Sequence, residues 1–165
     1  MTHGLILRPL YQFRWALQKN IHNSVFKYFK EIVMALNDYS KYTVLVIDDV
    51  PLNLLLVEKM LGRYKFAVKS AGGGQQGLDM IAEQMPDVVL LDLMMPNIDG
   101  YEVLRRLRSN SETKHLPVII LSALNSDADI IKGFKAGAND FVTKPIIMDK
   151  LIKAILKQVA PEEVK

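Results

Sequence analysis

The sequence of 165 residues contains no cysteine. Disulfide frameworks, thiolate nucleophiles and cysteine-based metal sites are therefore excluded, and the absence is consistent with a reducing cytoplasm, where we expect the chain to act. The sequence also lacks a run of about 18 consecutive apolar residues and the apolar core of a secretory signal, so we expect a soluble protein. The remaining composition, 50% hydrophobic and 24% charged, is ordinary for a globular domain.

Acidic residues are scarce only at the start of the chain. Residues 1–41 carry six Lys or Arg against two acids, a net charge of +4, whereas residues 42–165 carry 15 against 16, a net charge of −1. The first segment also holds seven of the 13 aromatic residues, including the only tryptophan, Trp15. We therefore predict an amino-terminal extension over 1–41, a domain over 42–160 and a short tail over 161–165.

The extension has the pattern of one long amphipathic helix from about Pro9 to Tyr39. Its apolar residues recur at helical spacing, as in Ile21, Val25, Tyr28, Ile32 and Ala35. Three roles are compatible with this pattern: a dimerisation helix, a linker from an upstream domain, and a basic helix on a membrane surface. Direct nucleic-acid binding is not expected, because no DNA-reading motif accompanies the lysines and aromatics.

The rest of the chain alternates between short apolar runs and amphipathic stretches. Strands are expected at 43–47, 66–69, 88–91, 118–121 and 140–143, and helices at 52–61, 75–84, 101–108, 128–136 and 148–159. This alternation favours an α/β fold, a doubly wound parallel sheet with helices on both faces.

The stretch DVVLLDLMMPNIDG, residues 87–100, contains the most informative strand. Its run from Val88 to Leu91 is wholly apolar, which is typical of a strand buried on both faces of a parallel sheet. Asp92 ends this run, at the edge where open α/β folds bind their ligands. Pro96 and Gly100 then favour a loop that leads into the next helix.

Polar residues follow three other strands of the predicted sheet. Asp48 and Asp49 follow the first strand, Ser122 the fourth and Lys144 the fifth. Because parallel strands end at the same edge, we expect these side chains to meet Asp92 there. Three carboxylates favour a hard cation such as Mg²⁺, while a lysine and a hydroxyl suit a phosphoryl group. Together they have the parts needed to form an aspartyl phosphate.

The motifs IDDVPLN, LLDLMMPNIDG, LSA and FVTKPI, in this order, resemble those of the receiver domain of two-component response regulators. The resemblance covers roughly residues 42–160. It implies a CheY-like, flavodoxin-like sheet of order 2-1-3-4-5. The implied function is phosphorelay signalling, in which a histidine kinase or phosphotransfer protein donates a phosphoryl group in a Mg²⁺-dependent reaction. Such a phosphoprotein is mainly a switch, and no independent substrate turnover is expected.

The resemblance also implies roles for individual residues. Asp92 would be the phosphoacceptor, and Asp49 would bind Mg²⁺ directly, together with Asp92 and the backbone carbonyl of Met94. Asp48 would be a supporting acid that acts through water. The apolar side chains of Met94 and Leu124 lie near the expected route of attacking water, and we expect them to slow hydrolysis of the phosphoryl group.

Further implied roles concern the switch. Ser122 matches the family's switch residue, Phe141 its rotating aromatic and Lys144 its phosphate-binding lysine, while Pro145 matches a position associated with a cis bond. Phosphorylation would change the face formed by the fourth helix, fifth strand and fifth helix of the domain. That face would bind a downstream protein partner or a second copy.

The same residues bear on two other functions. Phosphatases of the haloacid-dehalogenase kind need a second aspartate two residues after the nucleophile, where this chain has Met94. A phosphate-independent interaction module with a receiver-like fold is the alternative that stays open. Both a stand-alone regulator and a piece of a hybrid kinase fit the sequence.

Overall fold

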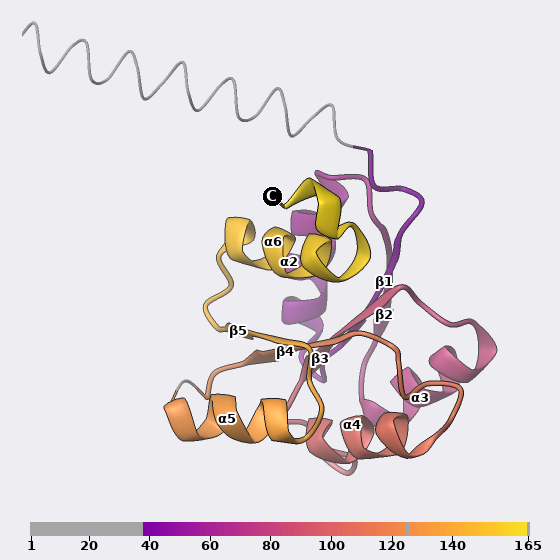
Figure 1. The fold of residues 1–165 in the computed structure, drawn as a ribbon, viewed down its shortest axis with the longest axis vertical. Coiled ribbons are helices and arrows are strands. Elements are labelled where there is room, and N and C mark those ends of the chain that lie inside the picture. Colours follow the sequence, from indigo (N-terminus) through magenta and orange to yellow (C-terminus); the bar gives the residue numbers. More distant parts are fainter. Residues whose placement is uncertain (1–37, 125, 165) are drawn as a thin grey trace, which may run out of the picture. The chain divides into compact units, whose positions relative to one another are not determined.

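The computed structural model describes residues 38–124 and 126–164, which form a five-stranded parallel sheet (Figure 1). The strands are β1 (Thr43–Ile47), β2 (Ala67–Ala71), β3 (Val88–Asp92), β4 (Val118–Ser122) and β5 (Asp140–Thr143). They lie side by side in the order β2-β1-β3-β4-β5, and each neighbouring pair is parallel. The predicted fold class and strand order are therefore confirmed.

In the part of the chain that the structure describes, five α-helices cover both faces of the sheet. They are α2 (Pro51–Gly62), α3 (Gly74–Glu83), α4 (Gly100–Ser109), α5 (Asp127–Lys135) and α6 (Met148–Val159), and a short 3-10 helix, η1 (Pro161–Glu163), follows. Figure 1 shows α2 and α6 on one face and α3, α4 and α5 on the other. Within the described residues, no helix is long and apolar enough to cross a membrane.

The central strands are buried because both of their faces pack against helices. All five residues of β3 are buried, and so are all five of β4. Alternate residues point to opposite faces, so Leu91 and Ile120 join the core beneath α3 and α4. This explains why the two strands read as continuous apolar runs rather than as alternating patterns.

The observed boundaries differ from the predicted ones by one or two residues, and two differences matter for the site. β3 extends to Asp92 and β4 extends to Ser122, one residue further than predicted in each case. In the ladders, Asp92 pairs with Leu121, and Ser122 pairs with Thr143. These polar residues are therefore the last rungs of the sheet and not the first residues of loops.

Glycines of the β2–α3 region allow close packing between a helix and the sheet. Gly77 is buried in α3, and a methyl group there would overlap the side chain of Ile47, with its Cγ1 atom at 2.9 Å. The glycine costs about 1 kcal/mol of helix propensity relative to alanine. In return, the absence of a side chain at Gly77 lets α3 pack directly against β1.

The helical prediction for the extension falls largely on residues 1–37, which lie outside the described residues. From residue 38 onward the chain is part of the folded domain. Tyr39 is buried, its ring stacks on Phe66 at 5.0 Å between centroids, and its N–H donates to the Tyr64 carbonyl. Tyr39 therefore packs onto the domain ahead of the boundary predicted near residue 41.

Candidate functional site

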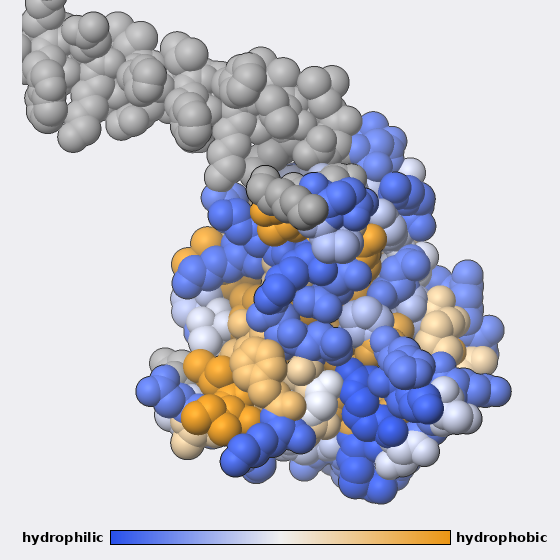
Figure 2. Space-filling model, in the orientation of Figure 1, coloured by the Kyte–Doolittle hydropathy of each residue, from blue (hydrophilic) through white to orange (hydrophobic). Residues whose placement is uncertain are grey.

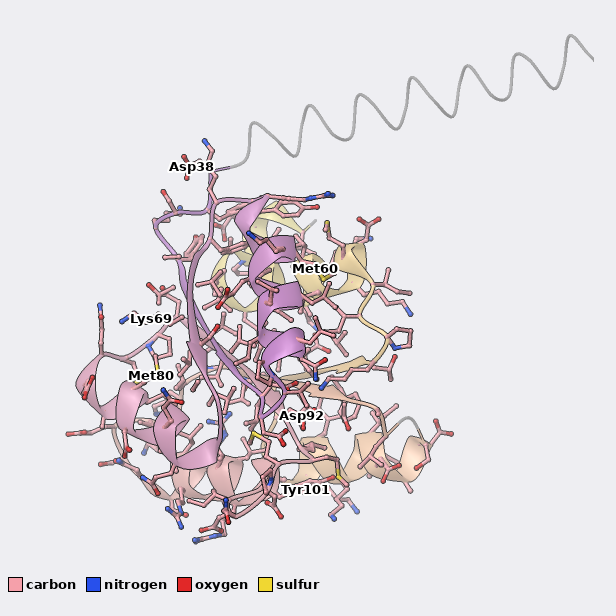
Figure 3. All side chains as sticks on the ribbon, turned by 180° about the vertical axis from the view of Figure 1, so that it is seen from behind. Asp38, Met60, Lys69, Met80, Asp92 and Tyr101 are labelled. Atoms are coloured by element: carbon pink, nitrogen blue, oxygen red, sulfur yellow. The ribbon has the colours of Figure 1, made fainter. Side chains whose placement is uncertain are left out.

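The carboxyl edge of the sheet brings the predicted site residues together. Asp48 and Asp49 follow β1, Asp92 ends β3, Ser122 ends β4, and Lys144 follows β5. Figure 3 shows Asp92 at this edge, beneath the end of α2 that lies away from Met60. Asp48 and Asp92 are only 2% and 6% exposed, so their charges depend on neighbouring groups for stabilisation.

The ammonium group of Lys144 bridges two of the acids. Its Nζ atom donates to Asp92 Oδ1 at 2.5 Å and to Asp48 Oδ2 at 2.7 Å. Burial lowers the pKa of Lys144, but the hydrogen bonds and charges of the two carboxylates outweigh it, and the net pKa is raised. Lys144 is therefore held as a cation at the acid cluster, as a phosphate-binding lysine requires. The Lys144–Pro145 peptide bond is cis.

The second oxygen of Asp92 faces the loop that follows β3. The Met94 N–H donates to Asp92 Oδ2 at 2.7 Å. Asn97 in this loop has φ 65°, a left-handed conformation that asparagine tolerates, and Asp99 caps α4 by accepting from the Glu102 N–H at 2.8 Å. The loop thus holds the Asp92 carboxylate through a backbone N–H.

Asp48 is held by a residue to which the sequence analysis assigned no role. The Asn53 amide donates to both carboxylate oxygens of Asp48, at 3.0 Å each, and the Val50 N–H donates to Oδ1 at 2.9 Å. Asn53 ends the motif IDDVPLN, which was recognised as a unit. The signal in the sequence is the spacing, because Asn53 lies five positions after Asp48, across the turn into α2.

Asp49 is in a different environment from its neighbour. It is half-buried, and within the described residues its carboxylate takes part in no hydrogen bond or ion pair. It lines a cavity of about 310 Å³ together with residues 72–76 and 96–98. Of the three acids, Asp49 is therefore the one whose oxygens are open to a ligand.

Ser122 ends β4, whereas Phe141 lies on the neighbouring strand β5, where it pairs with Ile120. Ser122 is fully buried, and its hydroxyl accepts from the Leu124 N–H at 3.1 Å. Among the described residues, no hydrogen bond joins this hydroxyl to Asp92 or to the Lys144 ammonium. Phe141 is partly buried in β5 and packs against the core cluster. The structure therefore brings the acids and Lys144 together directly and places Ser122 one strand away.

The oxygen atoms available as metal ligands at this edge are of the type that binds a small hard cation. They are carboxylate oxygens and the Met94 carbonyl, which accepts no hydrogen bond from the described residues, and Mg²⁺ prefers such oxygen ligands. In residues 38–124 and 126–164, no three acidic or histidine side chains are grouped closely enough to count as a metal cluster. Lys144 supplies the positive charge between Asp48 and Asp92 in this arrangement.

A doubly wound parallel sheet with a buried aspartate, two further acids and a lysine at its carboxyl edge is the arrangement of a receiver domain. The response regulator receiver domain family matches residues 44–156. The chain therefore belongs to this family, whose members act in phosphorelay signalling, as the sequence motifs predicted.

Individual response regulators are similar to this chain in sequence and in structure. The chain is 43% identical over 103 residues to the response regulator PleD of Caulobacter vibrioides, a match that covers 62% of this chain and 23% of PleD. A putative response regulator from Chloroflexus aurantiacus has a similar structure, with a TM-score of 0.69, 33% identity and coverage of 72% of this chain and 98% of that one.

A third comparison concerns the fold alone. The receiver domain of Saccharomyces cerevisiae Ssk1, solved in complex with the histidine phosphotransfer protein Ypd1, has a TM-score of 0.68 at 24% identity. This match covers 73% of this chain and 90% of that one. The chain spans about a quarter of the length of PleD.

Proposed function

We propose that Asp92 accepts a phosphoryl group, in a Mg²⁺-dependent reaction, from a histidine kinase or histidine phosphotransfer protein. The observation that carries the proposal is the position of the Asp92 carboxylate. It is buried at the sheet edge and held between the Lys144 ammonium and the Met94 N–H, with Asp49 open beside it. The Ssk1 receiver domain, which has this fold, was solved with such a phosphotransfer protein.

Asp92, Lys144 and Ser122 each have a separate role in the proposed reaction. An Asp92 carboxylate oxygen attacks the phosphorus of a phosphohistidine, the new O–P bond forms, and the P–N bond to the donor imidazole breaks. Lys144 neutralises charge on the transferred group, because its ammonium already lies 2.5 Å from the attacking carboxylate. Ser122 donates its hydroxyl hydrogen to a phosphoryl oxygen after the side chain moves from its present position.

Mg²⁺ would be held by Asp49, Asp92 and the Met94 carbonyl, with Asp48 as the supporting acid. The bound cation would neutralise charge on the phosphoryl oxygens. The carboxylates provide this site at neutral pH without any cysteine or histidine. The chemistry of the domain is limited to gain and loss of this phosphoryl group, and its location is proposed to be the cytoplasm.

The switch is proposed to connect this edge with the face formed by α5, β5 and α6. Phosphorylation adds charge and acceptor oxygens that draw Ser122 and Lys144 toward Asp92. Ser122 and Phe141 lie on the neighbouring strands β4 and β5, so movement of the serine frees space toward the aromatic ring. Driving such a change from 1:99 to 99:1 requires about 5.5 kcal/mol of differential stabilisation.

A groove on this face supports its role in partner binding. It has a volume of about 470 Å³, and its apolar lining includes Phe134, Phe141 and Val142. Figure 2 shows the corresponding hydrophobic patch over α5 and β5. The lysines of α6 that line the groove are Lys150, Lys153 and Lys157. A groove with an apolar floor and lysines beside it fits a partner segment that combines apolar and acidic residues.

A second copy of the chain is less suited to this groove. In a two-fold interface the same lysines would face one another, and like charges oppose association. We therefore expect phosphorylation to leave the association state of the chain unchanged. Sedimentation velocity before and after phosphorylation measures this, and a phosphorylation-dependent dimer would contradict the assignment to a partner.

Intact-mass measurement with a small phosphodonor tests the proposed function. Incubation with acetyl phosphate and Mg²⁺ should add one phosphate to the wild type. No phosphate should be added when Mg²⁺ is omitted or when the Asp92→Asn variant is used. Absence of the gain in a folded protein would favour the alternative, a phosphate-independent interaction module.

A further inference from the structure

The Asp48 carboxylate is almost completely surrounded by hydrogen-bond donors. It is 2% exposed, and its Oδ2 accepts from Lys144 Nζ at 2.7 Å. The other donors are the Val50 N–H, at 2.9 Å from Oδ1, and the Asn53 amide, at 3.0 Å from each oxygen. Asn53 is the only one among these that reaches both oxygens, so it fixes the rotation of the carboxylate plane.

The backbone around Asn53 holds its side chain in this orientation. Asn53 lies in the first turn of α2, which begins at Pro51, and its own N–H donates to the Val50 carbonyl at 3.0 Å. Proline at the start of a helix has a φ angle suited to that position. The turn therefore presents the amide to Asp48 rather than to solvent.

Asp49, the next residue, is an aspartate whose carboxylate has no such hydrogen-bond partner among the described residues. The Asp49 carboxylate takes part in no hydrogen bond within the described residues and faces the cavity beside residues 72–76. The two adjacent aspartates thus differ in their hydrogen bonds: donors hold the carboxylate of Asp48, and the carboxylate of Asp49 has none within the described residues. The amide of Asn53 accounts for two of the four hydrogen bonds that make this difference.

We propose that Asn53 is a positioning residue for the phosphoacceptor site, because it holds Asp48 in the orientation that supports Mg²⁺ and shares Lys144 with Asp92. The proposal rests on the proposed function. Asn53 itself touches neither the acceptor carboxylate nor a reacting atom. Its contribution is to stop the Asp48 carboxylate from rotating, since a misoriented acid would not support the cation, whereas Lys144 is still held by Asp92.

Partners of this kind in metal sites typically change metal affinity or activity by about 10- to 100-fold when they are removed. Asn53→Leu keeps the approximate size of the side chain and removes both donor hydrogens. We expect it to weaken Mg²⁺ binding at least tenfold. Asn53→Ser retains one short donor, and we expect its affinity to lie between those of the wild type and Asn53→Leu.

Mg²⁺ titration of the full chain by isothermal titration calorimetry tests the proposal without a phosphodonor. Asn110→Leu is a matched control, because Asn110, at the carboxyl end of α4, is also an asparagine whose side chain accepts a local hydrogen bond, from the Glu112 N–H. It should bind Mg²⁺ as the wild type does. Thermal unfolding of each variant identifies any that fails to fold, and Asn53→Ser serves as the milder replacement.

Phosphorylation by acetyl phosphate gives a second readout. For Asn53→Leu, the Mg²⁺ concentration at half-maximal rate should rise at least tenfold, while the rate at saturating Mg²⁺ should stay within about threefold of the wild type. A Mg²⁺ affinity for Asn53→Leu within twofold of the wild type would overturn the positioning role. If the wild type itself bound no Mg²⁺, the proposed function would fail first and the positioning role with it.

Discussion

Lys144 lies within hydrogen-bond distance of Asp92, with 2.5 Å between Nζ and Oδ1, although the two residues are 52 positions apart in the chain. The contact exists because β3 and β5 flank β4 in a parallel sheet and end at the same edge. It places a cation directly beside the carboxylate that we propose as the nucleophile. The proposed transfer of a phosphoryl group to Asp92 and the proposed switch both depend on this pair.

Removing the cation should slow phosphorylation with little change in fold. We expect Lys144→Met to lower the rate with acetyl phosphate by about 10²- to 10³-fold, the usual effect of losing one group that stabilises developing charge. Lys59→Met is the control, since Lys59 is exposed near the end of α2. Equal rates for Lys144→Met and the wild type would contradict the role of Lys144.

Gly100 controls the approach of α4 to the acceptor strand. A methyl group at this position would overlap the Asp92 carbonyl oxygen and lie 2.8 Å from Leu93 Cα, and backbone atoms have little room to shift. We expect Gly100→Ala to lower the free energy of unfolding by about 1 to 3 kcal/mol.

Gly62→Ala is the control for this change, because open space surrounds Gly62 at the end of α2. For Gly62→Ala we expect the free energy of unfolding to rise by about 0.4 to 1 kcal/mol, because alanine reduces the entropy of the unfolded chain. Urea denaturation of both variants measures the difference. The packing argument would be wrong if the two substitutions had the same sign.

Glu102 gives a prediction about pH. Hydrogen bonds from Arg105 and then Arg106 hold the pKa of Glu102 at about 2, below its ordinary value of 4.5. A carboxylate with a lowered pKa contributes stability that is present above pH 4.5 and is lost as the pH falls toward 2. Because the pair is exposed, the contribution is small and sensitive to salt.

Titration of the Glu102 side chain by NMR checks this directly. In Arg105→Gln the pKa of Glu102 should move up toward 4.5, since the hydrogen-bond donor that lowers it most is removed. Lys135→Gln, on α5, should leave the titration curve unchanged. A Glu102 pKa near 4.5 in the wild type would show that the arginines do not hold the carboxylate in solution.

Met94 and Leu124 are expected to lengthen the lifetime of the phosphoryl group. The Met94 side chain is 65% exposed next to Asp92, while its N–H is bound to Asp92 Oδ2. Neither apolar side chain can orient an attacking water, so we expect Met94→Asn and Leu124→Glu to hydrolyse faster than the wild type. Loss of the added phosphate, followed by intact mass, measures the rate. Unchanged lifetimes in both variants would contradict the idea.

Much of the fold follows from short-range patterns in the sequence. The unbroken apolar run that ends at Asp92 predicts a strand buried on both faces, and the same logic predicts the strand before Ser122. The shared edge then follows from parallel topology, which explains why the acids and Lys144 could be grouped in advance. Assignment of their separate roles required the resemblance to receiver domains.

Other features depend on distances that a linear pattern does not carry. The fork from Asn53 to Asp48 arises from the turn into α2, and an asparagine there is equally compatible with a simple helix start. Gly77 appears unfavourable in a helix until the contact with Ile47 is known. Similarly, the burial of Tyr39 depends on Phe66, a residue 27 positions away that reaches it through β2 pairing with β1.

The most direct test of the account is to locate the phosphoryl group on the chain. After phosphorylation by acetyl phosphate, borohydride reduction converts an acyl phosphate to an alcohol and so marks the modified aspartate for peptide mass spectrometry. We predict that the mark falls on Asp92 alone and disappears in Asp92→Asn. A mark on Asp48 or Asp49, or one that persists in Asp92→Asn, would contradict the assignment of Asp92 as the phosphoacceptor.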